Sequence, residues 1–435
     1  MHPSPHRTAV VAVAALTLAA PAAAQHDGHA PPVRDSSVRV APVVWYVGAT
    51  PVLTHATPTA GGRKLTEGYV AHPVAMLHAA TPRGALSLQA MLNAEGLTLR
   101  RGELATGVFG EGYVDRRHPH AYLHEIVLTG ATRAAGVHLS ASAGRGFAPF
   151  GSDDPLVRPF TKFPVNHHHA QLLERLVAIG AVRVGAFTGE VGTFNGDEPL
   201  GPGAEPRWRR FGDSWATRLT WRPARAIAGL GALEVSGSFA AVRSPEDPDR
   251  VIGLDQRKWH AGARIERPTR VGALYALAEW ARTTELDEGR PVFEYRSVLG
   301  EAALCGRRLH AALRLERTDR HEATRLEDLF RIPVPHDDVS IIGMTRWFTA
   351  TMRLGTAPWS AGMLRATPFV EGSIASPQDL IPRAAFQSHG FYGSRQLWLL
   401  STGIRLGVGA PHARMGRYGA ATAPAGSHAG THGGC

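Results

Sequence analysis

Residues 308–318, with the sequence RLHAALRLERT, limit the possible folds more than any other stretch of this chain. Apolar side chains fall on every second position from Leu309 to Leu315, and polar or small residues fill the gaps. Because successive side chains of a β-strand point to opposite faces, this alternation predicts a strand with one apolar and one charged face. A helix is the alternative, since Leu309, Ala312 and Glu316 also share one helical face. The strand is favoured because the pattern recurs at strand-like length.

The same alternation is found in several other segments. It is clearest at residues 86–93, 137–143, 215–222, 233–241 and 258–266. Between such segments, Pro268–Arg270 is expected to be a short turn, whereas Thr284–Arg290 and Arg317–Asp338 are expected to be charged loops. Segments of about ten residues with two unlike faces, joined by short turns and longer external loops, are typical of outer-membrane barrels. The sequence therefore predicts an all-β fold, an antiparallel transmembrane β-barrel of roughly 12–16 strands.

The N-terminal residues 1–24 have the features of a secretory signal peptide. A positive start at His6 and Arg7 precedes an apolar run and a small-residue cleavage site before Gln25. The run is too short for a membrane-spanning helix, which needs about 20 residues. We expect residues 25–38 to be a disordered His-containing tail, residues 39–410 to be the barrel, and residues 411–435 to be a Gly/Ala/His-rich tail. Export and a barrel fold together predict the bacterial outer membrane.

The charge of the chain is positive, with 47 Lys and Arg against 37 Asp and Glu. The basic residues are scattered along the segments without a basic block or interleaved aromatic residues, so no nucleic-acid partner is expected. Arginine instead recurs on the polar face of the clearest segments, which favours a cationic lumen that prefers anions modestly. The predicted lumen and selectivity residues are Arg218, Arg222, Arg264 and Arg314, mixed with Glu234, Glu266 and Glu316.

A set of motifs lies between residues 136 and 196. One alternating segment ends in Phe147–Gly151, a Leu-Glu-Arg step follows at Leu173–Arg175, and a hairpin then ends at Gly192–Gly196. In their order and spacing these motifs resemble the phosphate-selective porin O/P type of bacterial outer-membrane barrel. The resemblance implies a porin-like channel for passive diffusion of small solutes. With the arginine pattern, it predicts small, preferably anionic, solutes, together with outer-membrane lipid and the barrel-assembly machinery as partners.

Histidine-rich segments leave a metal-handling outer-membrane protein as one alternative, because neutral imidazole is a common metal ligand. The weak candidate ligands are His118, His120, His167, His168 and His169. A barrel hydrolase is the other alternative, with Asp115 beside His118 and His120. The sequence has no P-loop, no GxSxG elbow and no strand-to-helix GxGxxG. We therefore expect no enzyme, no catalytic residue, no cofactor and no confident metal site. The oligomeric state is left open.

Overall fold

The computed structural model describes only part of the chain. The described residues are 43–98, 120–199, 201–223, 227, 231–245, 247, 253–323, 341–410 and 414–422. The chain divides into two units, Met1–Val38 and Arg39–Cys435, and every described residue belongs to the second. The expected signal peptide, the stretch 25–38 and the candidate residues Asp115 and His118 lie outside the described residues. Within them, no helix has the length and apolar character that a membrane crossing requires.

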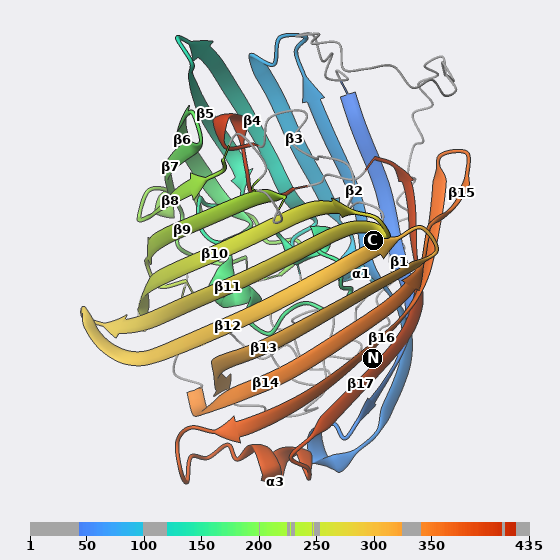
Figure 1. The fold of residues 1–435 in the computed structure, drawn as a ribbon. Helices are drawn as coiled ribbons and strands as arrows, with labels where there is room; N and C mark the ends of the chain where they lie inside the picture. The colour runs from blue at the N-terminus through green and yellow to red at the C-terminus, as the bar shows by residue number, and fades with distance from the viewer. Residues whose placement is uncertain are drawn as a thin grey trace, which may run out of the picture. The chain divides into compact units, whose positions relative to one another are not determined.

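Sixteen antiparallel strands form a closed ring in which each strand pairs with its neighbours along the chain (Figure 1). The first eight strands are β1 (Val43–Thr57), β2 (Leu65–Ala80), β3 (Leu86–Asn93), β4 (Leu123–Ala134), β5 (Val137–Gly146), β6 (Arg175–Val184), β7 (Phe187–Phe194) and β8 (Ser214–Trp221). The others are β9 (Ala232–Val242), β10 (Asp255–Thr269), β11 (Gly272–Asp287), β12 (Arg290–Gly306), β13 (Leu309–Ala323), β14 (Ile341–Thr356), β16 (Leu364–Asp379) and β17 (Leu397–Gly409). Pairing of β17 with β1 closes the ring. The predicted barrel is therefore confirmed, at the upper end of the predicted strand number.

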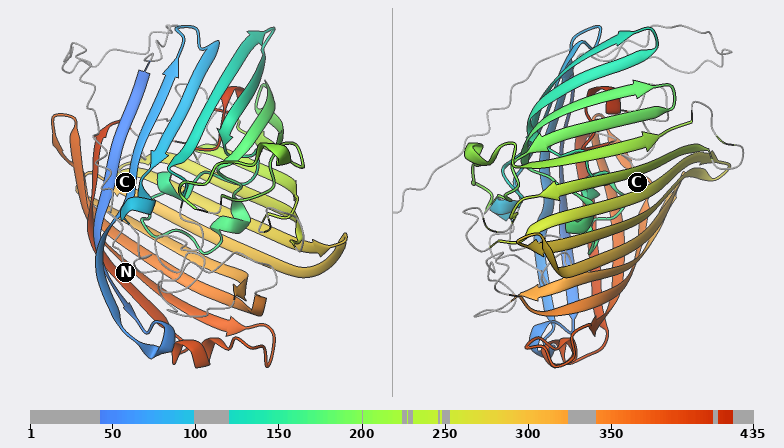
Figure 2. Two further views of the ribbon diagram at one scale, coloured as in Figure 1. Left: turned by 180° about the vertical axis from the view of Figure 1, so that it is seen from behind. Right: turned by 90° about the vertical axis from the view of Figure 1, so that its left-hand side faces the viewer.

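The remaining elements are short. The three-residue β15 (Trp359–Ala361) pairs with β16 and extends the β14–β16 hairpin. The short helices are α1 (Glu95–Thr98), α2 (His167–Ala170) and α3 (Ser388–Tyr392), with 3-10 turns η1 (Ala60–Gly62), η2 (Pro155–Val157), η3 (Trp208–Arg210) and η5 (Gly419–Ala421). Helix α2 lies within the ring of strands, whereas α3 lies at one end of it (Figures 1 and 2).

The two ends of the barrel differ in their connections. At one end, Ala135 and Gly136 join β4 to β5, both with positive φ, as a tight hairpin turn requires. At the other end, β5 and β6 are joined by Phe147–Glu174. Short turns face the periplasm and long loops face outward in outer-membrane barrels. One hairpin departs from this rule, because β11 and β12 extend through most of the expected loop Thr284–Arg290 and leave only a tight turn at the long-loop end.

Side chains alternate between the two faces of the wall as the sequence pattern predicts. On β13, Leu313 and Leu315 are 48% and 55% exposed on the outside, whereas Arg314 between them is fully buried inside. Trp215 and Trp259 are likewise exposed on the outer faces of β8 and β10. Side-chain burial therefore arises within the ring, and the outer surface is apolar.

The apolar outer surface forms a band with charged borders. On β10 the band runs from Trp259 to Ile265 between the exposed Arg257 and Arg267. Ion pairs lie beyond the band on the strands that follow. Arg282 of β11 pairs with Glu294 of β12, and Arg346 of β14 pairs with Asp319 of β13. An arginine facing lipid costs about 2–4 kcal/mol at the bilayer midplane and much less near its surfaces. The band therefore faces hydrocarbon, and the chain is a barrel of the bacterial outer membrane.

Candidate pore lining

The connection Phe147–Glu174, here called the inserted loop, crosses the interior of the barrel (Figure 2). Near its start, the backbone N–H of Gly151 donates to Ser238 Oγ of β9 at 2.9 Å. Further along, Arg158 Nη1 donates to Glu279 Oε2 of β11 at 3.0 Å. At its tip, the backbone N–H of Thr161 donates to Glu371 Oε2 of β16 at 2.9 Å. The loop therefore touches the wall at widely separated strands.

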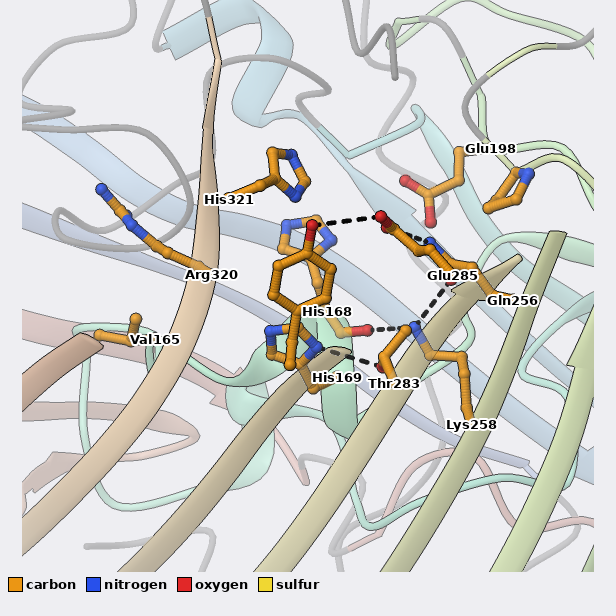
Figure 3. A pocket seen from close by; sticks show the side chains of 12 residues that line it. Val165, His168, His169, Glu198, Gln256, Lys258, Thr283, Glu285, Arg320 and His321 are labelled. Atoms are coloured by element: carbon orange, nitrogen blue, oxygen red, sulfur yellow. Dashed lines mark hydrogen bonds between the residues drawn. The ribbon is translucent and has the colours of Figure 1, made fainter. Parts of the chain in front are cut away.

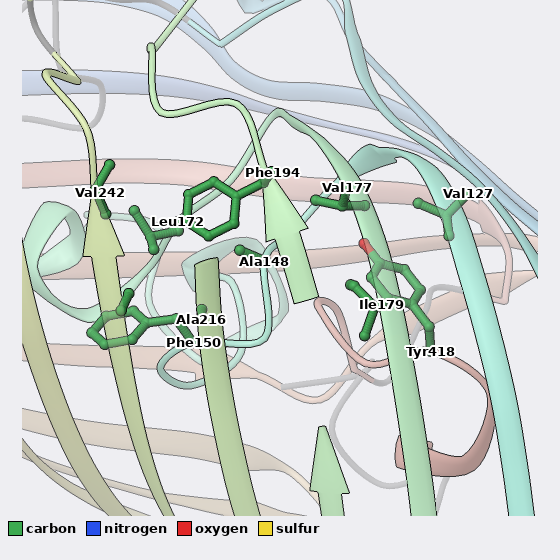
Figure 4. Packing of buried hydrophobic residues seen from close by; sticks show 11 residues of the cluster. Val127, Ala148, Phe150, Leu172, Val177, Ile179, Phe194, Ala216, Val242 and Tyr418 are labelled. Atoms are coloured by element: carbon green, nitrogen blue, oxygen red, sulfur yellow. The ribbon is translucent and has the colours of Figure 1, made fainter. Parts of the chain in front are cut away.

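Apolar side chains explain why this loop folds inward. Leu172 and Phe150 of the loop pack on the inner wall beside Val177, Ile179 and Phe194 (Figure 4). Strand β6 carries apolar residues on its inner face as well, so an empty lumen would expose them to water. Their burial under the loop is favourable at about 25 cal/mol per Å². The loop and the inner wall thus form a hydrophobic core together, which the wall alone could not form.

Carboxylates of the wall hold the loop by its backbone. Glu371 accepts the backbone N–H groups of Thr161 and Lys162, at 2.9 and 2.7 Å. Glu316 Oε2 accepts the backbone N–H of Val165 at 2.7 Å. Arg314 Nη1 donates to the carbonyl of Lys162 at 2.7 Å. Two of the predicted lumen residues, Arg314 and Glu316, therefore lie inside the barrel but fasten the loop.

Every arginine predicted for the lumen lies on the inner face and is paired with a carboxylate. Arg218 Nε lies 2.6 Å from Glu190 Oε2, and Arg314 Nε lies 2.8 Å from Glu301 Oε2. The other two predicted arginines pair as Arg222 with Glu234, and Arg264 with both Asp153 and Glu266. A paired arginine adds little net field to the lumen, because the carboxylate cancels its charge at a distance. These residues neutralise one another instead of forming a cationic surface.

Two arginines that the sequence did not single out form no ion pair with any carboxylate that the structure describes. Arg365 of β16 and Arg405 of β17 are diagonal neighbours, since Arg365 pairs in register with Gly407 and Thr367 with Arg405. Within the described part of the chain, neither guanidinium forms an ion pair, and Arg405 Nη2 has only the carbonyl of Phe160 at 3.5 Å. Both lie on the inner face toward the short-turn end. Alternation alone could have placed Arg405 inside, but only the register shows which arginines lack partners.

The four candidate histidines that the structure describes do not converge on one site. His120 Nδ1 lies 2.9 Å from Glu95 Oε2, and His169 Nδ1 lies 3.2 Å from Thr283 Oγ1. His167 Nδ1 is 3.0 Å from the carbonyl of Pro164, and the ring of His168 lies against that of His167. Among the residues that the structure describes, no group of three or more His, Cys, Asp or Glu side chains is placed to hold a metal ion. The described residues therefore lend the metal-handling alternative no support.

Near the start of β4, the His120–Glu95 contact is a buried ion pair. Burial disfavours both charges, but the hydrogen bond and the attraction between the two groups outweigh it. The pKa of His120 is therefore raised and that of Glu95 is lowered. The neighbouring His124 Nδ1 lies 2.7 Å from Glu174 Oε1, at the end of the inserted loop. These contacts fasten the start of β4 to α1 on one side and to the loop on the other.

A small pocket lies at the long-loop end, between the inserted loop and strands β10–β13 (Figure 3). Its lining includes His169, Lys258, Glu285, Tyr295 and Arg320. The ammonium of Lys258 donates to the carbonyl of His168 at 2.9 Å and to Gln256 Oε1 at 3.2 Å. The water-accessible space is only about 40 Å³. Charges of both signs line this pocket, so it does not select one sign of solute.

Comparisons with known proteins give a likeness in fold. No family model matches the sequence, and no curated protein matches it. The structure is similar to the anion-selective porin from Comamonas acidovorans, with 11% identity and a TM-score of 0.46, over 84% of this chain and 99% of that one. It is also similar to OmpT, an outer membrane protein of Vibrio cholerae, with 9% identity and a TM-score of 0.46, over 84% of this chain and 98% of that one. OccK9 (OpdG) of Pseudomonas aeruginosa gives 10% identity and a TM-score of 0.39, over 84% and 98%. The resemblance to the phosphate-selective type stays a prediction.

Proposed function

We propose that this chain is a porin-like channel of the outer membrane through which small solutes diffuse, with a modest preference for anions. The observation that carries the anion preference is the pair Arg365 and Arg405, which face the lumen and, among the residues placed in the structure, have no ion-paired carboxylate. Net positive charge elsewhere in the lumen is reduced by the pairing of Arg218, Arg264 and Arg314. The selectivity therefore depends on a few unpaired groups and not on the overall charge of +10.

The mechanism is electrostatic attraction of anions to these two guanidinium groups. An anion that enters the lumen exchanges part of its hydration shell for guanidinium donors, and the low-dielectric wall strengthens that attraction relative to water. Glu371 accepts backbone N–H groups of the inserted loop, so part of its negative charge is already satisfied there. Salt weakens the preference, because the screening length falls to about 8 Å at physiological ionic strength.

The test is the reversal potential of the reconstituted protein in a planar bilayer under a salt gradient. We expect the wild type to prefer anions, and Arg365→Gln with Arg405→Gln to remove that preference. The matched control is Arg383→Gln with Arg395→Gln, which removes the same charge from exposed positions between β16 and β17. Cation preference in the wild type, or equal shifts in the two double variants, would show the assignment to be wrong.

A further inference from the structure

A second segment of the chain lies inside the barrel. Residues Arg414–Thr422, here called the C-terminal segment, follow the last strand and are largely buried, with Met415 and Tyr418 almost completely so. Tyr418 packs beside Val127 and Ile179 of the inner wall (Figure 4). These contacts lie on the inner face of the ring, so the chain turns back into the lumen after β17.

Charged side chains bind this segment to both the wall and the inserted loop. Arg414 pairs with Asp153 of the loop, and its Nη2 lies 2.9 Å from Glu234 Oε1 of β9. Arg417 Nη2 lies 3.3 Å from the same Glu234 oxygen, and Arg417 Nη1 lies 3.6 Å from Glu190 Oε2 of β7. Three carboxylates from three parts of the barrel therefore converge on two arginines of one short segment.

Residues of the wall and of the inserted loop also form hydrogen bonds with the backbone and the phenol of the segment. Arg218 Nη2 donates to the carbonyl of Gly416 at 2.8 Å, and Arg183 Nη1 donates to the carbonyl of Thr422 at 2.9 Å. Tyr418 donates its hydroxyl hydrogen to Glu125 Oε1 at 2.6 Å and accepts the backbone N–H of Phe147 at 3.0 Å. The segment thus has a defined position along the inner faces of β4–β9.

Two glycines fit the segment closely to its surroundings. Gly416 has a φ of +74°, and a Cβ atom there would lie 3.2 Å from the ring of Phe147. Gly419 has a φ of +51°, and a Cβ atom would lie 2.4 Å from Ser140. Positive φ disfavours other residues, and the close approach leaves no room for a side chain. The backbone therefore packs directly against β5 and the inserted loop.

We propose that the C-terminal segment is a built-in plug that sets the size limit of the channel. It fills the β4–β9 side of the lumen, opposite the strands that carry Arg365 and Arg405. Solutes are thereby confined to the passage beside those arginines. The inference rests on the proposed channel function, and it names the segment that makes the passage narrow.

The first experiment compares the wild type with a chain that ends at Ala410, in liposomes that swell as uncharged sugars of increasing size enter. We expect the truncated barrel to admit larger sugars than the wild type. We also expect its single-channel conductance to be about twofold higher or more, because side chains that fill a barrel lumen reduce the cross-section open to solutes. If neither chain admits any solute, the proposed channel function is wrong. If both admit the same sugars while the truncated barrel is folded, the channel function stands and the plug is refuted.

A full-length variant keeps the test decisive if truncation prevents assembly. Arg414→Gln with Arg417→Gln loosens the segment, while Arg222 and Arg264 still neutralise Glu234 and Asp153. We expect a size limit between those of the wild type and the truncated chain, and more frequent current fluctuations. The matched control is again Arg383→Gln with Arg395→Gln, which should behave as the wild type. A size limit and current noise equal to those of the control would overturn the proposal.

Discussion

At the scale of single residues, buried ion pairs stabilise the interior. In the pair His120–Glu95 both members have shifted pKa values, so its contribution to stability can be followed by changing the pH. Glu95 is fully buried and His120 is nearly so, and Asn93 Nδ2 donates to Glu95 Oε2 at 3.2 Å. Removing one partner of a buried pair costs about 3–5 kcal/mol, because the other charge is left without compensation. The stability of this barrel should therefore depend on pH through this pair.

The sign follows from the two pKa shifts. The pKa of His120 is raised, so its contribution is fully present below its ordinary value of 6.5 and is lost as the pH rises through the raised pKa. The pKa of Glu95 is lowered, so its contribution is present above its ordinary value of 4.5 and is lost as the pH falls through the lowered pKa. Both contributions are complete between pH 4.5 and 6.5.

We predict that His120→Gln lowers the free energy of unfolding by about 3 kcal/mol inside that window. The loss should shrink at strongly acid pH, where Glu95 is protonated, and at alkaline pH, where His120 is neutral in the wild type. Urea unfolding of the folded barrel in lipid vesicles, repeated across pH, measures it. His389→Gln, at an exposed position in α3, is the control. A loss that does not change with pH would contradict the ion-pair assignment.

At the scale of one strand, β13 carries two neighbouring side chains whose environments are opposite. Leu313 faces lipid, whereas Arg314 is fully buried, pairs with Glu301 and has its guanidinium 4.2 Å from the ring centroid of Phe160. Leu313→Arg should cost about 2–4 kcal/mol and block assembly, because it places a charge in hydrocarbon. Arg314→Leu should cost up to about 3–5 kcal/mol, because the buried Glu301 then keeps only the more distant Arg158, 3.8 Å away, as a cationic partner.

The two losses can be told apart by a second substitution and by the yield of folded barrel in detergent. Adding Glu301→Leu to Arg314→Leu should restore part of the yield, since it removes the buried carboxylate that has lost its nearest arginine, while Arg158 keeps Glu279 as its partner. Adding it to Leu313→Arg should restore nothing. Rescue of both variants, or of neither, would contradict the assignment of faces.

Strands such as β13 could be predicted because their alternation is local. The same reasoning placed Arg218 and Arg314 inside, but it could not show that both are neutralised. The partner of Arg158 is Glu279, which lies 121 positions away, so no local pattern reveals that contact. Strand β6 is apolar on both faces because the inserted loop covers its inner face, and that cover depends on the whole barrel. Predicting which charged residues pair at the site therefore requires the register of strands that are distant in sequence.

For the whole molecule, the closed ring predicts resistance to detergent. Each of the sixteen wall strands has hydrogen-bonded neighbours on both sides, so the described part of the barrel offers SDS no free edge in its wall at which to begin unfolding. We predict that unheated and boiled samples migrate differently on SDS gels and that the far-UV circular dichroism is of β type. Fractionation should recover the protein with the outer membrane. A soluble periplasmic protein, or a mainly helical spectrum, would contradict the fold.

The number of strands and the filling of the lumen are properties of the whole ring. The sequence predicted the first within a range but did not predict the second. Alternating segments bounded the strand number, because each wall strand must present an apolar side to lipid. The C-terminal segment was expected only as part of a tail, since Arg414–Thr422 has no period and no apolar run. Its place in the lumen depends on Asp153, Glu190 and Glu234, which come together only after closure.

The depth of the inserted loop has an electrical consequence. The apolar band on β13 spans Leu309–Leu315, and Arg314 at that height bonds the loop at Lys162. The inserted loop thus lies at the height of the insulating slab, so an applied voltage falls across it. One elementary charge moved through 100 mV changes in energy by about 2.3 kcal/mol. A few hundred millivolts therefore compete with the ion pairs that hold the loop, whereas the same pairs at either rim would feel almost no field.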